Sequence, residues 1–451
     1  MGRNHHDSLC NRYPTTARGF AETVNWALKA PLKPIKKSLF IEYYDQSGFT
    51  LLSWTLSASQ AELIAKILNM VVAFVAVVVF TSLVRWFRRQ YLTFIFSCFF
   101  LICYGAYSRV VVNPGDVIVW SFYLFGDLYA TLMVATFFAF MNDSVTPDAA
   151  KRLYGIVGLG GVVGGVLGAT TVRGFIASVS LASWLWICFG LGLVIIAVAY
   201  VSGRMVDSQL QTEPLNPADQ TATPPESVRQ NPAMEGAQLV FRSPYLLSIV
   251  GIVGLYELVS TVMDFQFTST IAHYLDGPEI GKQFATVFAI TNVVSMCVQL
   301  FLTSLIMTRF GLGVALLILP VMVLIGSAGF MIAPVLWMGS LLNTLDNGFS
   351  YSINQSAKEA LYVPTTTDEK YKAKAFIDMF VQRFVKAIAV LLGLVMTLVF
   401  EDFATLRWLS VFTLVATLIW MVAARYAGHQ FQARTTERDE LHAHPQPEQS
   451  G

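Results

Sequence analysis

Charged residues are scarce in this sequence: Lys, Arg, Asp and Glu together make up 13 % of the 451 residues, about half the share found in soluble domains. The 30 basic and 29 acidic residues give a formal net charge of only +1, so there is no basic field to attract nucleic acid. The five cysteines have neither metal-binding nor disulfide-framework spacing. These shortages argue against a soluble enzyme, a disordered chain, a nucleic-acid binder and a zinc protein, and we expect neither an enzyme nor a cofactor.

Long apolar runs dominate the chain, of which 55 % is hydrophobic. A bilayer core about 30 Å thick takes roughly 20 apolar residues of helix, and eleven stretches reach this length. The pattern therefore predicts an all-α polytopic membrane protein whose surroundings are the lipid bilayer. The stretches are approximately 62–84, 91–112, 117–141, 153–172, 175–201, 245–275, 284–307, 312–333, 335–357, 375–399 and 406–427.

A polar, proline-rich break at 203–243 separates five of these stretches from six and is typical of a linker. An equal division requires a further span in front, and the candidate is 38–58, although Glu42 and Asp45 would be costly in lipid. We therefore predict twelve spans with a degenerate first one. The predicted parts are a cytoplasmic amphipathic segment at 1–37, bundles at 38–202 and 244–428 joined by the cytoplasmic linker 203–243, and a cytoplasmic polar tail at 429–451.

The distribution of Lys and Arg supports this topology. With twelve spans and the N-terminus inside, most basic residues fall in inner loops, and the outer loops hold Arg109, Arg173, Lys282 and Arg407. Such a bias is the positive-inside pattern. We recognise no signal or transit peptide in the sequence, so the predicted location is a bacterial inner membrane with both termini in the cytoplasm.

Three pairs of similar positions indicate an internal duplication at an offset of about 223 residues, as is common in transporters. Asn69 corresponds to Asn292, Arg85 lies near the counterpart of Arg309, and Ala150-Lys151 corresponds to Ala373-Lys374. The same offset places the counterpart of 245–275 at about 22–52, where lysines interrupt the apolar pattern. The repeat and the hydropathy therefore disagree about the first helix.

Three segments resemble the ATP/ADP carrier-like branch of the major facilitator superfamily, which includes the nucleotide carriers of plastids and intracellular bacteria. They are Trp120–Asp143, ending Phe-Phe-Ala-Phe-Met-Asn-Asp; the glycine-rich Ala150–Gly168; and Ala357–Pro364 with Lys370–Asp378 and Arg383–Lys386. The resemblance implies two six-helix bundles around a central cavity and exchange of a nucleotide or another phosphorylated solute.

The sequence also departs from this family. Its nucleotide carriers have basic residues in the first helix, whereas the predicted span 38–58 has none and carries Glu42 and Asp45. The third segment lacks the small residues that usually follow its last lysine, because Ala387-Ile-Ala-Val stands there. Both departures weaken the inference of a nucleotide substrate.

Ionisable and polar groups inside predicted spans are candidates for substrate binding, because they are expensive in lipid unless they face a cavity or one another. The alternative for each is a structural pair or an interhelical hydrogen bond. Asp127 lies mid-span, Glu257 and Asp264 share one helix face with Ser260, and a second polar stripe lies within the predicted span 335–357. This second stripe consists of Asn343, Asp346, Asn347, Ser350 and Asn354.

A basic group in the eleventh span completes the candidates. Lys374 and Asp378 are four residues apart and can pair, while Arg383 and Lys386 lie deeper and need an anion. Arg383 suits bidentate contact with phosphate. Glu62 and Lys66, also four residues apart, are expected to form an interfacial pair.

The glycine run 155–168 lacks the Gly-Lys-Ser/Thr ending of a phosphate-binding loop and lies in an apolar span, so we interpret it as close helix packing. The six histidines show no metal-binding pattern. We predict a secondary transporter that moves a small anionic solute, with ATP or ADP as candidate substrates, by alternating access. Two alternatives stay open: a proton-coupled carrier of a non-nucleotide solute, and a non-transporting scaffold; no protein partner is indicated.

Overall fold

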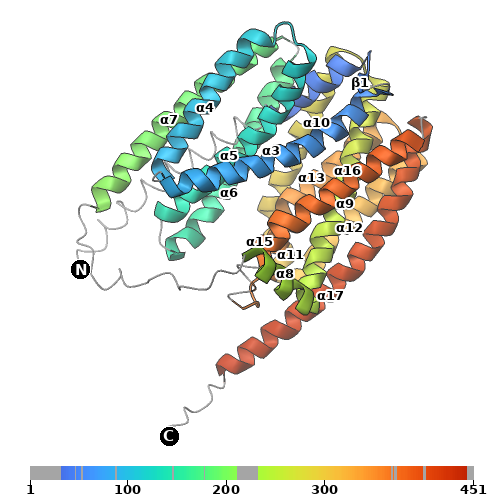
Figure 1. Ribbon diagram of the computed structural model, residues 1–451. Coiled ribbons are helices and arrows are strands. Elements are labelled where there is room, and N and C mark those ends of the chain that lie inside the picture. The colour runs from blue at the N-terminus through green and yellow to red at the C-terminus, as the bar shows by residue number, and fades with distance from the viewer. Residues whose placement is uncertain are drawn as a thin grey trace. The chain divides into compact units, whose positions relative to one another are not determined.

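The computed structural model of the protein (Figure 1) describes residues 32–45, 47–51, 54–86, 89–144, 147–176, 178–210, 232–366, 369, 373–399 and 403–443. These residues are almost entirely helical, with one two-stranded antiparallel hairpin. They divide by packing into two units, Met1–Ser227 with Leu275–Asn292, and Val228–Tyr274 with Val293–Gly451. The division differs from the predicted bundles in the stretch Leu275–Asn292, which packs with the first unit.

The first unit begins with a helix at 32–44 and the hairpin β1–β2, and aromatic side chains fill its core. The Phe100 ring makes a tilted contact with Phe125 and an edge contact with Tyr129 there. Helix α4 packs on α5 and α7, and α3 packs on α5. The elements are β1 Phe49–Leu51, β2 Trp54–Leu56, α3 Ala58–Trp86, α4 Arg89–Val110, α5 Asp116–Ser144, α6 Pro147–Phe175, α7 Leu181–Leu210 and the greater part of α10 Pro278–Cys297.

The predicted first span at 38–58 is wrong. Among the described residues the helix covers 32–44, and Phe49–Leu51 pairs with Trp54–Leu56 as a hairpin, with Phe49 opposite Leu56. Pro34 lies near the start of the described residues of this helix. Gly48, at φ +63°, closes the other end and donates its N–H to the Tyr44 carbonyl. The lysines that hid this helix from hydropathy therefore lie on it, as the offset of the repeat indicated.

The second unit is a helical bundle whose core surrounds Trp420, Leu319 and Ile249. Helix α9 packs on α13, α16 and α17, and α12 packs on α13 and α17. Its elements are α8 Pro232–Arg242, α9 Pro244–Tyr274, π-helix η2 Val298–Thr303, α11 Ser304–Arg309, α12 Gly311–Ile332, α13 Leu336–Phe349, π-helix η3 Ser350–Asn354, α14 Gln355–Leu361, α15 Lys374–Phe376, π-helix η5 Ile377–Val381, α16 Gln382–Val399, 3₁₀-helix η6 Phe403–Trp408 and α17 Leu409–Ala443.

Two further boundaries differ from the sequence prediction. The predicted linker 203–243 is helical at both ends, in α7 and α8, while 211–231 lies outside the described residues. The predicted polar tail continues α17 as far as Ala443. Polar composition in these places therefore did not mark the end of a helix.

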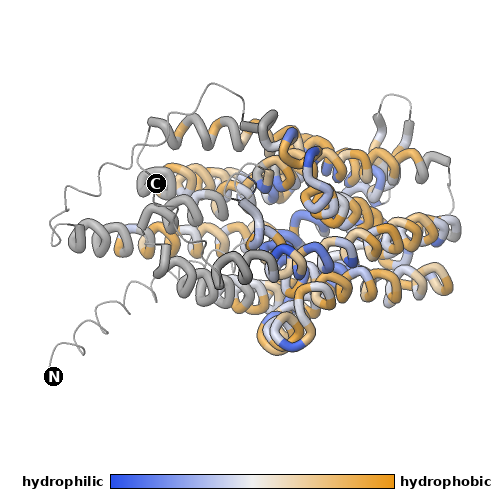
Figure 2. The backbone as a smooth tube through the Cα atoms, turned by 90° about the horizontal axis from the view of Figure 1, so that it is seen from below, coloured by the Kyte–Doolittle hydropathy of each residue, from blue (hydrophilic) through white to orange (hydrophobic). Residues whose placement is uncertain are grey.

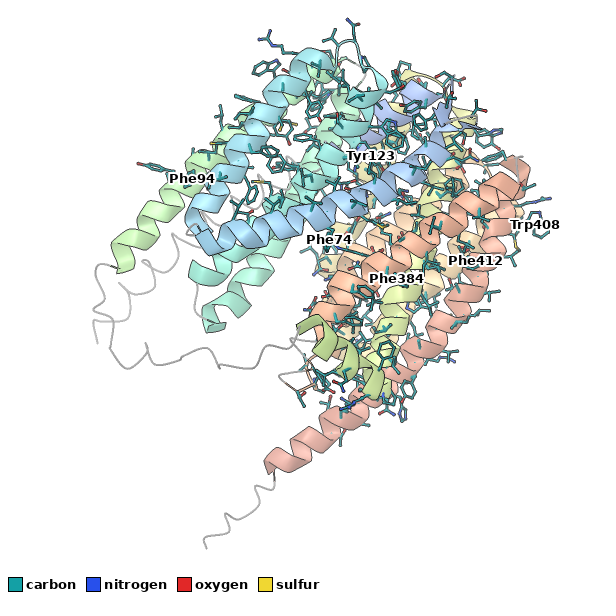
Figure 3. The ribbon with its side chains drawn as sticks, viewed as in Figure 1. Phe74, Phe94, Tyr123, Phe384, Trp408 and Phe412 are labelled. Carbon is teal, nitrogen blue, oxygen red and sulfur yellow. The ribbon has the colours of Figure 1, made fainter. Side chains whose placement is uncertain are left out.

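Six helical segments within the described residues are long and apolar enough to cross a membrane. Figure 2 shows hydrophobic residues along much of the described helices, and large side chains such as Phe74 and Trp408 (Figure 3) are more than half exposed. A surface of this kind needs lipid around it. The segments are Ala58–Ala76, Leu181–Val198, Pro244–Tyr274, Pro278–Arg309, Gly311–Ile332 and Thr405–Thr436; the count of twelve spans stays a prediction.

Candidate substrate-binding site

Three lysines of the 32–44 helix project from one face, because residues three and four apart lie together on a helix. Lys36 and Lys37 are buried, at 5 % and 3 % exposure, and Lys33 lies one turn before them. A buried ammonium group is tolerated only with compensating charges or dipoles. The packing of the first unit provides these for each lysine.

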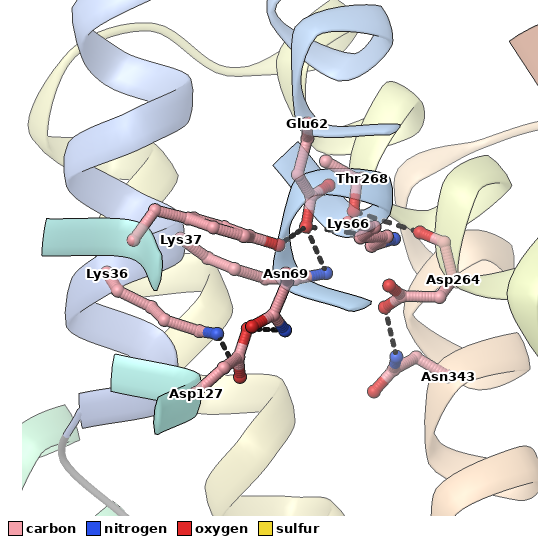
Figure 4. Close-up of polar contacts among 10 residues, drawn as sticks. Lys36, Lys37, Glu62, Lys66, Asn69, Asp127, Asp264, Thr268 and Asn343 are labelled. Atoms are coloured by element: carbon pink, nitrogen blue, oxygen red, sulfur yellow. Dashed lines mark hydrogen bonds and ion pairs between the residues drawn. The ribbon is translucent and has the colours of Figure 1, made fainter. Parts of the chain in front are cut away.

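Lys36 forms an ion pair with Asp127 of α5, whose other carboxylate oxygen accepts a 2.7 Å hydrogen bond from the Asn69 amide (Figure 4). Its ammonium group also lies 4.4 Å from the ring centroid of Tyr123, one helical turn before Asp127. Gly126 leaves room for the lysine stem, since a Cβ there would come within 2.8 Å of Lys36 Cδ. Asp127 remains about one-third exposed.

Glu62 of α3 gathers three donors on a single oxygen. Its Oε1 accepts a 2.8 Å hydrogen bond from Tyr123 Oη and lies 3.2 Å from Lys37 Nζ and 3.7 Å from Lys66 Nζ (Figure 4). The side chain is only 1 % exposed. The predicted Glu62–Lys66 pair therefore forms, but it is part of a buried cluster and is not interfacial.

Aromatic rings of α10 complete the surroundings of the lysines. Lys33 lies 4.7 Å from the Phe288 ring centroid and Lys37 lies 5.6 Å from that of Phe284. These two rings stack one turn apart on α10. Each gives a partly desolvated lysine an additional favourable contact without adding a negative charge.

We call Lys33, Lys36, Lys37, Lys66, Glu62 and Asp127 the lysine cluster. Lys36 pairs with Asp127, Lys37 and Lys66 lie at Glu62, and most of these side chains are buried. A group of this kind is suited to an anion, and phosphate oxygens accept readily from several ammonium donors.

In the second unit, polar side chains link α9 to α13 and α16. Ser260 donates a 2.6 Å hydrogen bond to Asp346, Asn343 lies at 3.5 Å from Asp264, and Gln382 donates to Glu257. Asn347 donates to the carbonyl of Asn343 one turn away. The structure therefore brings the predicted stripes of α9 and α13 together at one helix interface.

The basic group on α15–α16 is arranged differently from the prediction. Lys374 forms its ion pair with Glu359 of α14, whereas Asp378, four residues on, is exposed. Arg383 is half-buried and Lys386 is exposed. Within the described part of the chain, neither of these two has an ion-pair partner.

The sequence interpretation missed Lys36 and Lys37, which it assigned to a cytoplasmic segment, and it missed Tyr123. The departure it noted, a first helix without basic residues, is wrong, since three lysines lie on that helix. The signal that could have found them is the duplication offset, which placed the first helix at 22–52. The first span was instead placed at 38–58 from hydropathy, which counts every lysine as unfavourable in lipid. Hydropathy does not take into account that a carboxylate on another helix can pair with the lysine.

The glycine run lies within helix α6, as its apolar setting predicted. A Cβ on Gly165 would lie 3.4 Å from the side chain of Asn292, which donates a 3.3 Å hydrogen bond to the Gly165 carbonyl. Glycine at this position therefore allows a side chain of α10 to reach the backbone of α6.

Solved structures define the class of protein to which this fold belongs. The nucleoside transporter NupG superposes with a TM-score of 0.56 at 12 % identity, covering 93 % of this chain and 99 % of that one. A bacterial homologue of the human lysosomal transporter Spinster, inward-facing and unoccupied, gives 0.53 at 13 %, covering 94 % and 98 %. The fold is that of the major facilitator transporters, and the protein is a multi-pass membrane protein.

The family follows from sequence. The model of the TLC ATP/ADP transporter family matches residues 116–431, and the chain belongs to this family. It is 24 % identical over 358 residues to ADP,ATP carrier protein 1 of Arabidopsis thaliana chloroplasts and 25 % identical over 359 residues to ADP,ATP carrier protein 1 of Chlamydia muridarum. Each match covers 71 % of this chain, with 56 % of the plant protein and 66 % of the chlamydial one. The chain therefore spans little more than half the length of the plant relative.

Proposed function

We propose that the protein exchanges ATP and ADP across a bacterial inner membrane by alternating access. Membership of the TLC family supports the nucleotide substrate, the printed names of the relatives support exchange, and the chlamydial relatives support a bacterial membrane. The alternatives of a non-nucleotide carrier and a scaffold are not favoured by these relatives. The observation that carries the proposal is the buried Lys36, whose ion-pair partner Asp127 is about one-third exposed.

In the proposed mechanism the substrate phosphates compete with Asp127 for Lys36. Asp127 is the more exposed of the two carboxylates and holds Lys36 when no nucleotide is bound. An entering phosphate takes over the ammonium group, and release of the phosphate restores the pair. The lysine thus keeps an anionic partner in both states, which avoids an unpaired charge within the membrane.

We propose a second set of phosphate contacts from Arg383 and Lys386, each an ionic group without an ion-pair partner among the described residues. An unpaired cation in a predicted span requires an anion. In this proposal the site is lined by the polar residues at the interface of α9 and α13, which are Glu257, Asp264, Asn343, Asp346 and Asn347. Lys374 and Asp378 lie towards its cytoplasmic end.

Counterflow in proteoliposomes tests the proposal. Vesicles preloaded with unlabelled ADP should take up labelled ATP saturably, and vesicles without internal nucleotide should not. Lys36→Ala should lower uptake at least tenfold, since it removes a charge-assisted phosphate contact. The control is Lys282→Ala, because Lys282 is an exposed lysine of the same unit and pairs with Glu279 on its own helix. Uptake by this variant should match the wild type. Equal uptake by all three proteins would contradict the assigned site, and no nucleotide uptake by the wild type would contradict the function.

A further inference from the structure

The two carboxylate oxygens of Glu62 have very different surroundings. Oε1 accepts from Tyr123, Lys37 and Lys66. Oε2 is buried and has no hydrogen-bond partner among the residues that the structure describes. A buried carboxylate oxygen without a donor is costly, and in native proteins such an atom calls for an explanation.

Glu62 cannot easily turn to satisfy this oxygen. The three donors on Oε1 come from three helices, the 32–44 helix, α3 and α5, and hold the carboxylate in one orientation. A rotation that offered Oε2 to them would leave Oε1 without partners. A molecule that enters the cluster can supply the donor that this oxygen lacks.

The position of Oε2 limits the chemistry of that donor. It lies within the lysine cluster, so a donor belonging to an anion can be held there by the lysines while it satisfies Glu62. A phosphate group at neutral pH is mainly an acceptor and would be repelled by the carboxylate. In a nucleotide the neutral donors closest to the phosphates are the ribose hydroxyls, and carboxylates bind ribose hydroxyls in other nucleotide sites.

We propose that Glu62 accepts a hydrogen bond from a ribose hydroxyl of the transported nucleotide and thereby selects ribonucleotides over phosphate compounds without these hydroxyls. This inference rests on the proposed nucleotide transport and adds a specificity-determining residue to it. The two carboxylates of the cluster then have separate roles. Asp127 gives way to phosphate, whereas Glu62 stays in place and reads the sugar.

Inhibition of ATP exchange measures this selectivity. Proteoliposomes preloaded with ADP take up labelled ATP in the presence of unlabelled ATP or 2′,3′-dideoxy-ATP, and the ratio of the two inhibition constants is compared between variants. In the wild type, ATP should inhibit about tenfold better, as expected for one hydrogen bond to a charged acceptor. Glu62→Ala should bring the ratio close to one. Lys282→Ala is the control, because it removes an exposed lysine of the same unit that pairs with Glu279 on its own helix; it should keep the wild-type ratio.

The outcomes separate the two proposals. A wild type that does not discriminate, or a Glu62→Ala variant that still does, overturns the role of Glu62 while nucleotide transport stands. A wild type that exchanges no ATP overturns both. If Glu62→Ala does not fold, Glu62→Gln is examined in detergent by the thermal shifts that ATP and dideoxy-ATP produce; a smaller difference between the two shifts than in the wild type supports the inference, and an unchanged difference overturns it.

Discussion

At the scale of single residues, the lysine cluster shows how a membrane protein keeps several cations in an apolar setting. Lys36 forms an ion pair with Asp127, and Lys37 and Lys66 share the carboxylate of Glu62. Lys33 lies against the aromatic ring of Phe288. Glu62, Lys66 and Asn69 lie on one face of α3 at spacings of four and three residues, opposite Tyr123 and Asp127 of α5. Residues three and four positions apart share a helix face, and this spacing lets Glu62 and Asn69 of α3 contact Tyr123 and Asp127 of α5.

The Lys36–Asp127 pair leads to a prediction about stability. Asp127→Asn leaves the buried ammonium group without its carboxylate and should lower the melting temperature in detergent by several degrees. The double variant Lys36→Met/Asp127→Asn removes both charges and should recover most of that loss, while nucleotide uptake stays low. The melting temperatures of Lys36→Met, Asp127→Asn and the double variant form a double-mutant cycle. If the two single losses add up to the loss of the double variant, the two residues do not interact.

At the scale of elements, helices α12 and α17 approach closely where two glycines meet. A Cβ on Gly428 would come within 2.8 Å of the Gly313 Cα, a backbone atom that cannot turn aside. Gly428→Ala should therefore force the helices apart at a cost of about 1–3 kcal/mol and lower the melting temperature. The control is Gly190→Ala on α7, where no atom lies within 4 Å of the added methyl group, and it should be neutral or slightly stabilising. Equal effects of the two substitutions would contradict the contact.

The end of α17 also ties three elements together. The Arg434 guanidinium lies 4.5 Å from the ring centroid of Tyr245 at the start of α9 and 4.0 Å from Glu369 in the segment after α14. Glu369 and Thr366 in turn exchange side-chain and backbone hydrogen bonds, as in a capping box. Tyr245 donates a 2.6 Å hydrogen bond to the Leu361 carbonyl.

Arg434→Ala should loosen this junction without unfolding the bundle. We expect faster amide hydrogen exchange in residues 361–366 and in the start of α9, because a cation–π contact and an ion pair are lost. Arg425→Ala, which removes an exposed arginine of the same helix, is the control and should leave exchange there unchanged. Unchanged exchange in Arg434→Ala would show that the contacts contribute nothing to the order of this segment.

At the scale of the whole molecule, the predicted topology can be tested by labelling single cysteines in a protein freed of its five native ones. Ser47 is exposed after the 32–44 helix, Ser178 is exposed between α6 and α7, and Thr366 is exposed after α14. Twelve spans with cytoplasmic termini place Ser47 and Ser178 outside and Thr366 inside. An impermeant maleimide added to intact cells should label Ser47→Cys and Ser178→Cys, and should label Thr366→Cys only after the membrane is opened. Labelling of all three in intact cells would contradict twelve spans with cytoplasmic termini.

Much of the fold follows from the sequence by itself, because a bilayer imposes a minimum length on every apolar helix. The long apolar runs indicated a membrane protein, and the polar break between them indicated the linker. The duplication offset indicated a helix in 22–52. Hydropathy failed at the 32–44 helix, since it scores each residue against lipid and counts Lys36 as a cost.

Only the tertiary structure decided which charges meet. Lys36 and Asp127 are 91 positions apart, and Lys37 and Glu62 lie on different helices with a hairpin between them. The energy of such a pair depends on distances of a few ångströms, which helix packing sets and residue spacing along the chain does not. The same reason explains why Lys374 pairs with Glu359 and not with Asp378, its neighbour one turn away. Sequence could therefore identify ionisable residues within the membrane, whereas their partners, and with them the lysine cluster, arise from the fold.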